Sequence, residues 1–144
     1  MSRLRWWFVA VGIFYVLLSI MTLPFVSGSV LGSTYPDLAA ETGSLAVTLL
    51  REIYFMFGLD MLVIGIFLLF ASRDPLRYIP VAWLVIALEI VRGVLDDIYM
   101  IARGYPAAGY IAFIAIHLLI ILTGVWAIRS AQASGRTAQA VAPA

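Results

Sequence analysis

The sequence contains no cysteine and little charge, and each absence excludes a class of function. Without cysteine there are no disulfides, thiolate nucleophiles, iron–sulfur clusters or thiolate zinc sites. Charged residues make up 12% of the 144 residues, and the formal net charge is only +1. No basic surface can therefore be large enough to neutralise a nucleic-acid backbone, and we expect no nucleic-acid partner.

Apolar residues, in contrast, make up 64% of the chain, and the mean hydropathy of +1.05 is far above that of a soluble globular protein. They gather in four stretches, each long enough to cross ~30 Å of hydrocarbon at ~1.5 Å per residue. The sequence predicts an all-α integral membrane four-helix bundle, with one domain over residues 1–129 and a disordered tail over 130–144. The predicted helices are Leu4–Leu23, Leu45–Ala71, Tyr78–Ile101 and Ala107–Ile128.

The connections between these stretches differ in length. Asp74-Pro75 is typical of a helix start, and Gly104 with Pro106 separates the third and fourth stretches. Such short links require helices two, three and four to run as antiparallel neighbours. The longer connection over 24–44 is predicted to be a loop with a short helix at 36–41.

Arginine supplies every basic residue, and its distribution predicts the orientation of the bundle. Cytoplasmic flanks of membrane helices retain positive charge. Six arginines flank one side against only Arg103 in an opposite loop, so we expect both termini to be cytoplasmic in a bacterial inner membrane. The first stretch could instead be a cleaved secretion signal ending near Ser29, but its apolar core is longer than usual and favours an uncleaved anchor. The six are Arg3, Arg5, Arg73, Arg77, Arg129 and Arg136.

Ionisable residues inside the apolar stretches are the candidate functional residues. An ionisable group near the bilayer centre costs roughly 2.5–3.5 kcal/mol on insertion scales, so such groups face the bundle interior and find partners. Five carboxylates accompany two arginines in these stretches, so three negative charges need another means of neutralisation. Asp97 and Glu52 could also reach the lipid headgroups. The predicted ligand-binding residues are Glu89, Arg92, Asp96, His117, Asp60 and Glu52.

Steps of three and four residues place Glu89, Arg92, Asp96, Tyr99 and Arg103 along one predicted stripe of the third helix. Glu89 and His117 should lie at a similar depth near the middle of the membrane. The predicted geometry is a polar cavity that opens outward and ends at this depth.

This polarity has two interpretations. In the structural one, Glu89, Arg92 and Asp96 pair with one another and buried acids hold a proton. In the functional one, the unbalanced acids and His117 bind a proton, a cation or the polar end of a lipophilic molecule. We expect no metal or cofactor, because the paired Glu-x-x-His spacing of di-iron bundles is absent and one histidine offers a haem a single axial ligand. No phosphate-binding glycine loop or serine triad occurs.

Several strings resemble the BphX-like family of small bacterial membrane proteins over about Leu4–Ile128. They are Leu-Arg-Trp-Trp near the N-terminus, the run Phe57–Pro75, and Glu-Ile-Val-Arg-Gly-Val-Leu-Asp-Asp-Ile-Tyr at Glu89–Tyr99. The family name comes from aromatic-hydrocarbon degradation operons, so the resemblance implies a hydrophobic small-molecule context and transfers no catalytic residue. The architecture also resembles DoxX-type four-helix membrane proteins, some of which are linked to quinone chemistry.

Three functions remain open. The first is a membrane binding or transport module for a lipophilic, aromatic or quinone-like molecule, with the polar end of that molecule at Glu89, Arg92 and His117. The second is a membrane enzyme, an isomerase or quinone-linked oxidoreductase, in which Glu89 or Asp60 exchanges protons with the substrate. The third is an accessory subunit of a homo-oligomer or a larger membrane complex.

Overall fold

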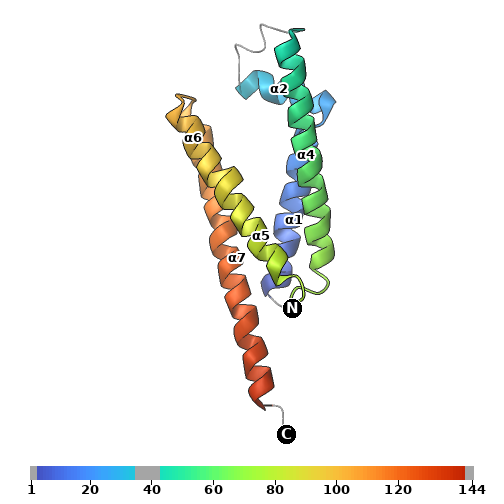
Figure 1. Ribbon diagram of the computed structural model, residues 1–144, viewed down its shortest axis with the longest axis vertical. Helices are drawn as coiled ribbons and strands as arrows, with labels where there is room; N and C mark the ends of the chain where they lie inside the picture. Colours follow the sequence, from blue (N-terminus) through green and yellow to red (C-terminus); the bar gives the residue numbers. More distant parts are fainter. Residues whose placement is uncertain (1–2, 35–42, 142–144) are drawn as a thin grey trace. The chain divides into compact units, whose positions relative to one another are not determined.

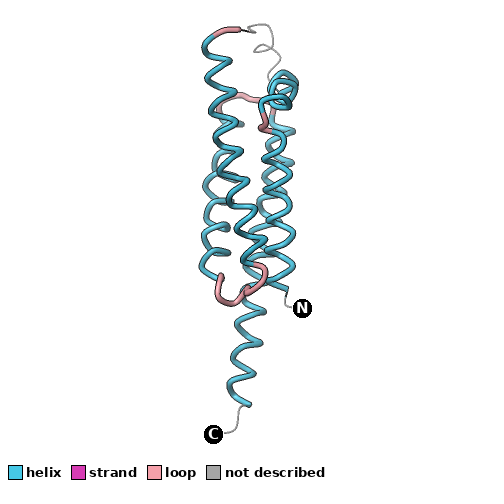
Figure 2. The backbone as a smooth tube through the Cα atoms, turned by 90° about the vertical axis from the view of Figure 1, so that its right-hand side faces the viewer, coloured by secondary structure: helices cyan, strands magenta, loops and turns pink. Residues whose placement is uncertain are grey.

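The computed structural model describes residues 3–34 and 43–141, and all regular structure in these ranges is helical (Figure 2). The chain divides into two compact units. The first consists of Ala10–Phe70 and is named the α4 unit below. The second consists of Met1–Val9 with Ala71–Ala144 and is named the α7 unit.

The α4 unit contains most of α1 (Arg3–Met21), followed by α2 (Pro24–Thr34) and α4 (Leu45–Ala71). Two glycines allow α1 and α4 to approach closely: a Cβ atom added to Gly12 would lie 3.0 Å from the carbonyl oxygen of Gly65. A Cβ atom on Gly58 would overlap the side chain of Thr22. Small residues of this kind let membrane helices pack backbone against backbone.

Helix α2 corrects the prediction of a loop from residue 24. Proline is well suited to the first position of a helix, and Pro24 begins α2. Ser27 is fully buried, so tertiary packing outweighs the low helix propensity of serine and glycine in this segment. The short helix predicted at 36–41 lies outside the described residues.

The α7 unit is built around a helical hairpin (Figure 1). Its first arm is continuous and consists of α5 (Ile79–Leu88), the π-helical segment η1 (Glu89–Leu95) and α6 (Asp96–Ala102). The second arm is α7 (Ala107–Val141). Gly104 adopts a φ of 92° in the turn between them, a left-handed conformation that glycine accepts without a steric penalty.

The predicted bounds agree with the structure for α4 and differ at the end of α7. Helix α7 continues to Val141, whereas a disordered tail was predicted from residue 130. Alanine, glutamine and arginine are strong helix formers, and the first proline after α7 begins is Pro143, so nothing in this segment stops the helix.

Three of the helices are long and apolar enough to cross a membrane: Arg3–Met21, Leu45–Ala71 and Ala107–Ser134. Their surfaces carry large apolar side chains, such as Val63 at 67% and Leu122 at 68% exposure. Such surfaces are suited to lipid rather than to water. The described part of the chain is therefore all-helical, with three helices suited to a membrane.

Candidate functional site

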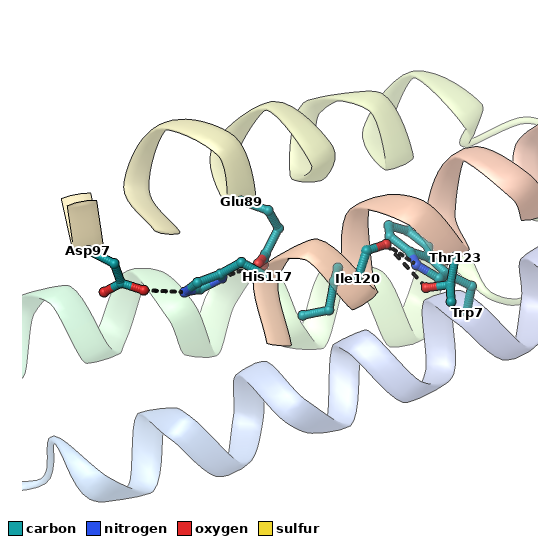
Figure 3. Close-up of polar contacts among 6 residues, drawn as sticks. All are labelled: Trp7, Glu89, Asp97, His117, Ile120 and Thr123. Carbon is teal, nitrogen blue, oxygen red and sulfur yellow. Dashed lines mark hydrogen bonds and ion pairs between the residues drawn. The ribbon is translucent and has the colours of Figure 1, made fainter. Parts of the chain in front are cut away.

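Glu89, His117 and Asp97 form a polar cluster between the two arms of the α7 hairpin (Figure 3). The Nδ1 atom of His117 is 2.5 Å from Oε2 of Glu89, a short hydrogen bond. The Nε2 atom, across the ring, is 3.7 Å from Oδ2 of Asp97. We name these three residues the carboxylate–histidine cluster.

The cluster is shielded from solvent. Glu89 is 2% exposed and Asp97 is 8% exposed. Oδ2 of Asp97 is buried and has no hydrogen-bond partner in the described part of the chain. A buried polar atom without a partner carries a desolvation cost of about 1–3 kcal/mol, more if charged, so this oxygen is where a proton or a donor group would bind most favourably.

Gly93 makes room for the imidazole between the two carboxylates. A Cβ atom at this position would lie 2.5 Å from Cγ and Nδ1 of His117. The ring is therefore packed against the η1 backbone at a point where any side chain would displace it. Phe113 lies one turn before His117 on α7, with its ring centroid 6.4 Å from that of the imidazole.

The π-helical segment places both carboxylates on one face. Two turns of α-helix take about seven residues, so positions eight apart are rotated by about 80° in a regular helix. A π-turn adds about one residue to the turn in which it occurs. With this added residue, positions eight apart face the same side of the helix. Glu89, Gly93 and Asp97, spaced by four, are accordingly all buried.

The single stripe predicted for the third helix is wrong. Glu89 is buried, but the other four members, Arg92, Asp96, Tyr99 and Arg103, are exposed. The stripe assumed a uniform α-helical period, whereas η1 changes the register after Glu89. In the cluster the buried acid is not Asp96 but its neighbour Asp97, for which the lipid headgroups were one of the predicted locations.

Two further predicted site residues lie on α4. Glu52 and Asp60 are exposed on α4 and belong to the other compact unit. Of the six predicted residues, the structure thus brings together Glu89 and His117. The signal that could have identified Asp97 and Gly93 is a glycine placed midway between two acids that are eight positions apart.

The chemistry available to the cluster is that of two carboxylates and an imidazole. In the described ranges, no three histidine or acidic side chains are grouped so that they could hold a metal ion. Imidazole can donate or accept at either nitrogen, and carboxylates accept protons. The arrangement can therefore bind a proton or a hydrogen-bonding group and can exchange protons with it.

A second polar contact fixes α7 beside the start of α1, within the same unit. Nε1 of Trp7 donates a hydrogen bond of 3.0 Å to the carbonyl oxygen of Ile120, less than one turn from His117. Oγ1 of Thr123 also contacts this oxygen at 3.2 Å (Figure 3), beside its shorter hydrogen bond of 2.6 Å to the carbonyl oxygen of Leu119. Gly124 allows the indole to approach, because a Cβ atom there would lie 2.9 Å from the Trp7 ring.

Residues 1–133 match the BphX-like family. An uncharacterized BphX-like protein from Burkholderia cepacia is 37% identical over 131 residues, which cover 90% of this chain and 94% of the relative. A second, from Paraburkholderia xenovorans strain LB400, has the same identity and coverage. No solved structure matches. A family match over most of the sequence and relatives at this identity show that the chain belongs to the BphX-like family.

Proposed function

We propose that this protein binds a lipophilic small molecule within the bacterial inner membrane and holds the polar end of that molecule at the carboxylate–histidine cluster. The observation that carries the proposal is Oδ2 of Asp97, a buried acceptor without a hydrogen-bond partner, 3.7 Å from an imidazole nitrogen. A hydrogen-bonding group at this position would remove the cost of the unpaired oxygen. The surrounding helix surfaces are apolar and suit a lipophilic body.

The proposal includes a fourth membrane span over residues 79–102. This continuous helical run is about 36 Å long at ~1.5 Å per residue, enough for ~30 Å of hydrocarbon. It packs along α7, which is apolar enough to span. Its four charged residues lower its hydropathy, and two of them, Glu89 and Asp97, are buried in the cluster.

Both termini are proposed to be cytoplasmic. The excess of arginines at one end of the helices, six against one, favours this orientation. Contacts inside the α7 unit support placing the N-terminus with the later part of α7. The guanidinium of Arg3 lies 4.3 Å from the ring centroid of Trp126, and its Nη1 donates to Oγ of Ser130 at 3.4 Å.

Purification in mild detergent followed by native mass spectrometry tests the binding proposal. We expect a small lipophilic molecule to remain bound to the wild type in stoichiometric amount. Asp97→Asn should weaken the affinity for that molecule at least tenfold, which corresponds to about 1.4 kcal/mol, and so lower the bound fraction. Asp96→Asn is the matched control, because it removes the adjacent, exposed carboxylate. Equal binding by both variants would contradict the site.

A second candidate function is a membrane enzyme, and the Glu89–His117 hydrogen bond favours it. A carboxylate on Nδ1 orients an imidazole so that Nε2 faces a substrate, the arrangement used in general acid–base catalysis. The same mass measurement separates the two functions. Conversion of the bound molecule over time indicates an enzyme, an unchanged molecule indicates a binding module, and stoichiometric foreign chains indicate an accessory subunit.

A further inference from the structure

The two ring nitrogens of His117 face two different carboxylates on the opposite arm of the hairpin (Figure 3). Nδ1 contacts Glu89 at 2.5 Å, and Nε2 faces Asp97 at 3.7 Å. Imidazole can hold a proton on either nitrogen, and it can accept one at one nitrogen while it releases another from the second. The three side chains are thus arranged in series: acid, imidazole, acid.

We propose that this series is a proton relay, in which His117 passes a proton between Asp97 and Glu89. In the inward step the Asp97 carboxylic acid gives its proton to Nε2, and the Nδ1 proton passes to the Glu89 carboxylate. Asp97 ends as a carboxylate, Glu89 as a carboxylic acid, and the imidazole as the Nε2–H tautomer. One proton has moved from Asp97 to Glu89, the reverse step restores the first tautomer, and no electron is transferred.

The contact between Asp97 and His117 is the step that controls the relay. At 3.7 Å it is too long for a hydrogen bond, whereas the Glu89 contact is already formed. Movement of the Asp97 carboxylate by about 1 Å brings the two atoms to charge-assisted hydrogen-bonding distance. Because Oδ2 has no hydrogen-bond partner, this movement breaks no hydrogen bond at that oxygen.

The relay leads from the turn at 103–106 toward the interior of the helical run. Asp97 lies six positions before Arg103, about 9 Å along a helix, and Glu89 lies about 12 Å further in. Glu89, at 2% exposure, is the more buried acid. The relay needs no bound molecule; its location inside the membrane rests on the proposed fourth span.

The chain contains a single histidine, which makes the relay directly observable. Histidine labelled with ¹⁵N in the ring gives signals from His117 alone, and these signals distinguish the two neutral tautomers. In the pH range where the ring is neutral, we expect the wild type to show both tautomers in exchange. Asp97→Asn should leave only the Nδ1–H tautomer, which donates to Glu89. Glu89→Gln should shift the population toward Nε2–H.

Asp96→Asn is the control and should give the wild-type signals, because its carboxylate is exposed and outside the series. A fixed structural hydrogen bond predicts a different result: the wild type would show only the Nδ1–H tautomer, as Asp97→Asn does. That result would overturn the relay. The wild-type spectrum decides this without any variant, so a variant that fails to fold does not prevent the test.

Exchange of the ring protons with D₂O provides a second measurement. If protons reach the ring through Asp97, Asp97→Asn should slow exchange roughly 100-fold, the lower range for a positioned acid or base, and Asp96→Asn should not. Equal rates in the two variants would refute the relay. A wild type with one tautomer that still carries a lipophilic molecule would remove the relay and leave the proposed binding function intact. A wild type that shows both tautomers in exchange but carries no bound molecule would support the relay and contradict the proposed binding function.

Discussion

At position 93 the absence of a side chain lets the His117 ring lie between its two carboxylates. Gly93→Ala would place a Cβ atom 2.5 Å from the ring, so the imidazole or the backbone must move. Such overpacking costs about 1–3 kcal/mol, and the better helix propensity of alanine offsets about 1 kcal/mol of it. We expect a lower thermal stability in detergent, measured by circular dichroism.

Gly109→Ala is the matched control for this variant. Gly109 also lies in a helix, but an added Cβ would meet nothing within 4 Å. Alanine there should be neutral or stabilising by up to about 1 kcal/mol. If Gly93→Ala were as stable as Gly109→Ala, the close packing of His117 on η1 would be refuted.

Trp7 supplies a second prediction at the residue scale. Trp7→Phe removes the hydrogen bond to the Ile120 carbonyl but retains an aromatic ring. Because the Thr123 hydroxyl can rotate to donate to that oxygen, which it already contacts at 3.2 Å, we expect a loss of only about 0.5–1.5 kcal/mol. Adding Thr123→Val should cost more than the sum of the single changes, since the carbonyl then loses both side-chain donors.

The measurement is unfolding by heat or denaturant, with Trp83→Phe as the control. Trp83 is 45% exposed and should tolerate the change. Additive losses in the Trp7 and Thr123 double variant would show that the two donors do not share one acceptor.

At the scale of helices, the contact between α1 and α4 depends on two glycines. Gly65→Ala would place a Cβ atom 2.9 Å from the Gly12 carbonyl oxygen and 2.9 Å from Cγ2 of Val16. Backbone atoms cannot rotate away, so we expect this variant to lose about 1–3 kcal/mol, again reduced by the propensity of alanine.

Gly12→Ala acts on the same contact, since its Cβ would lie 3.0 Å from the Gly65 carbonyl oxygen. Once one methyl group has separated the helices, the second meets less resistance. Thermal melts of the double variant should therefore show a loss smaller than the sum of the two single losses. A fully additive loss would contradict a shared contact.

The hydrophobic pattern was sufficient to predict the helices but not their internal register. Apolar stretches and the Gly104 and Pro106 signals predicted α4, the α5–α6 run and the start of α7, because burial in lipid requires length and composition above all. The π-turn changes neither composition nor length. It was therefore invisible to a periodicity argument, which in turn assigned Asp96 instead of Asp97 to the site.

Helix α2 and the end of α7 were missed for different physical reasons. In α2, burial of Ser27 outweighs poor propensity, a tertiary effect that local sequence does not report. In α7, the polar composition after Ser130 was interpreted as disorder, although its alanines and glutamines favour a helix. Glu89 and His117 were predicted to lie at a similar level of the bundle, because both are ionisable groups at the centre of long apolar runs.

For the whole molecule, the orientation in the membrane decides which acid of the carboxylate–histidine cluster lies nearer the outer surface. If both termini are cytoplasmic, the turn at 103–106 faces outward and Asp97 is the acid nearer the outer surface. Only Arg103 is predicted near this turn, whereas six arginines are predicted at the other end of the helices. Positive charge is retained on the cytoplasmic side, so that other end is the cytoplasmic one.

The lack of native cysteine makes this orientation testable by single substitutions. Ser2→Cys and Ala144→Cys should resist a membrane-impermeant thiol reagent in intact spheroplasts and react after permeabilisation. Ser33→Cys, in the connection between α1 and α4, should react in intact cells. Labelling of position 2 from outside would reverse the orientation and place the Asp97 end of the relay on the cytoplasmic side. Labelling at positions 2 and 144 on opposite sides would require an odd number of spans, and residues 79–102 would then not cross the membrane.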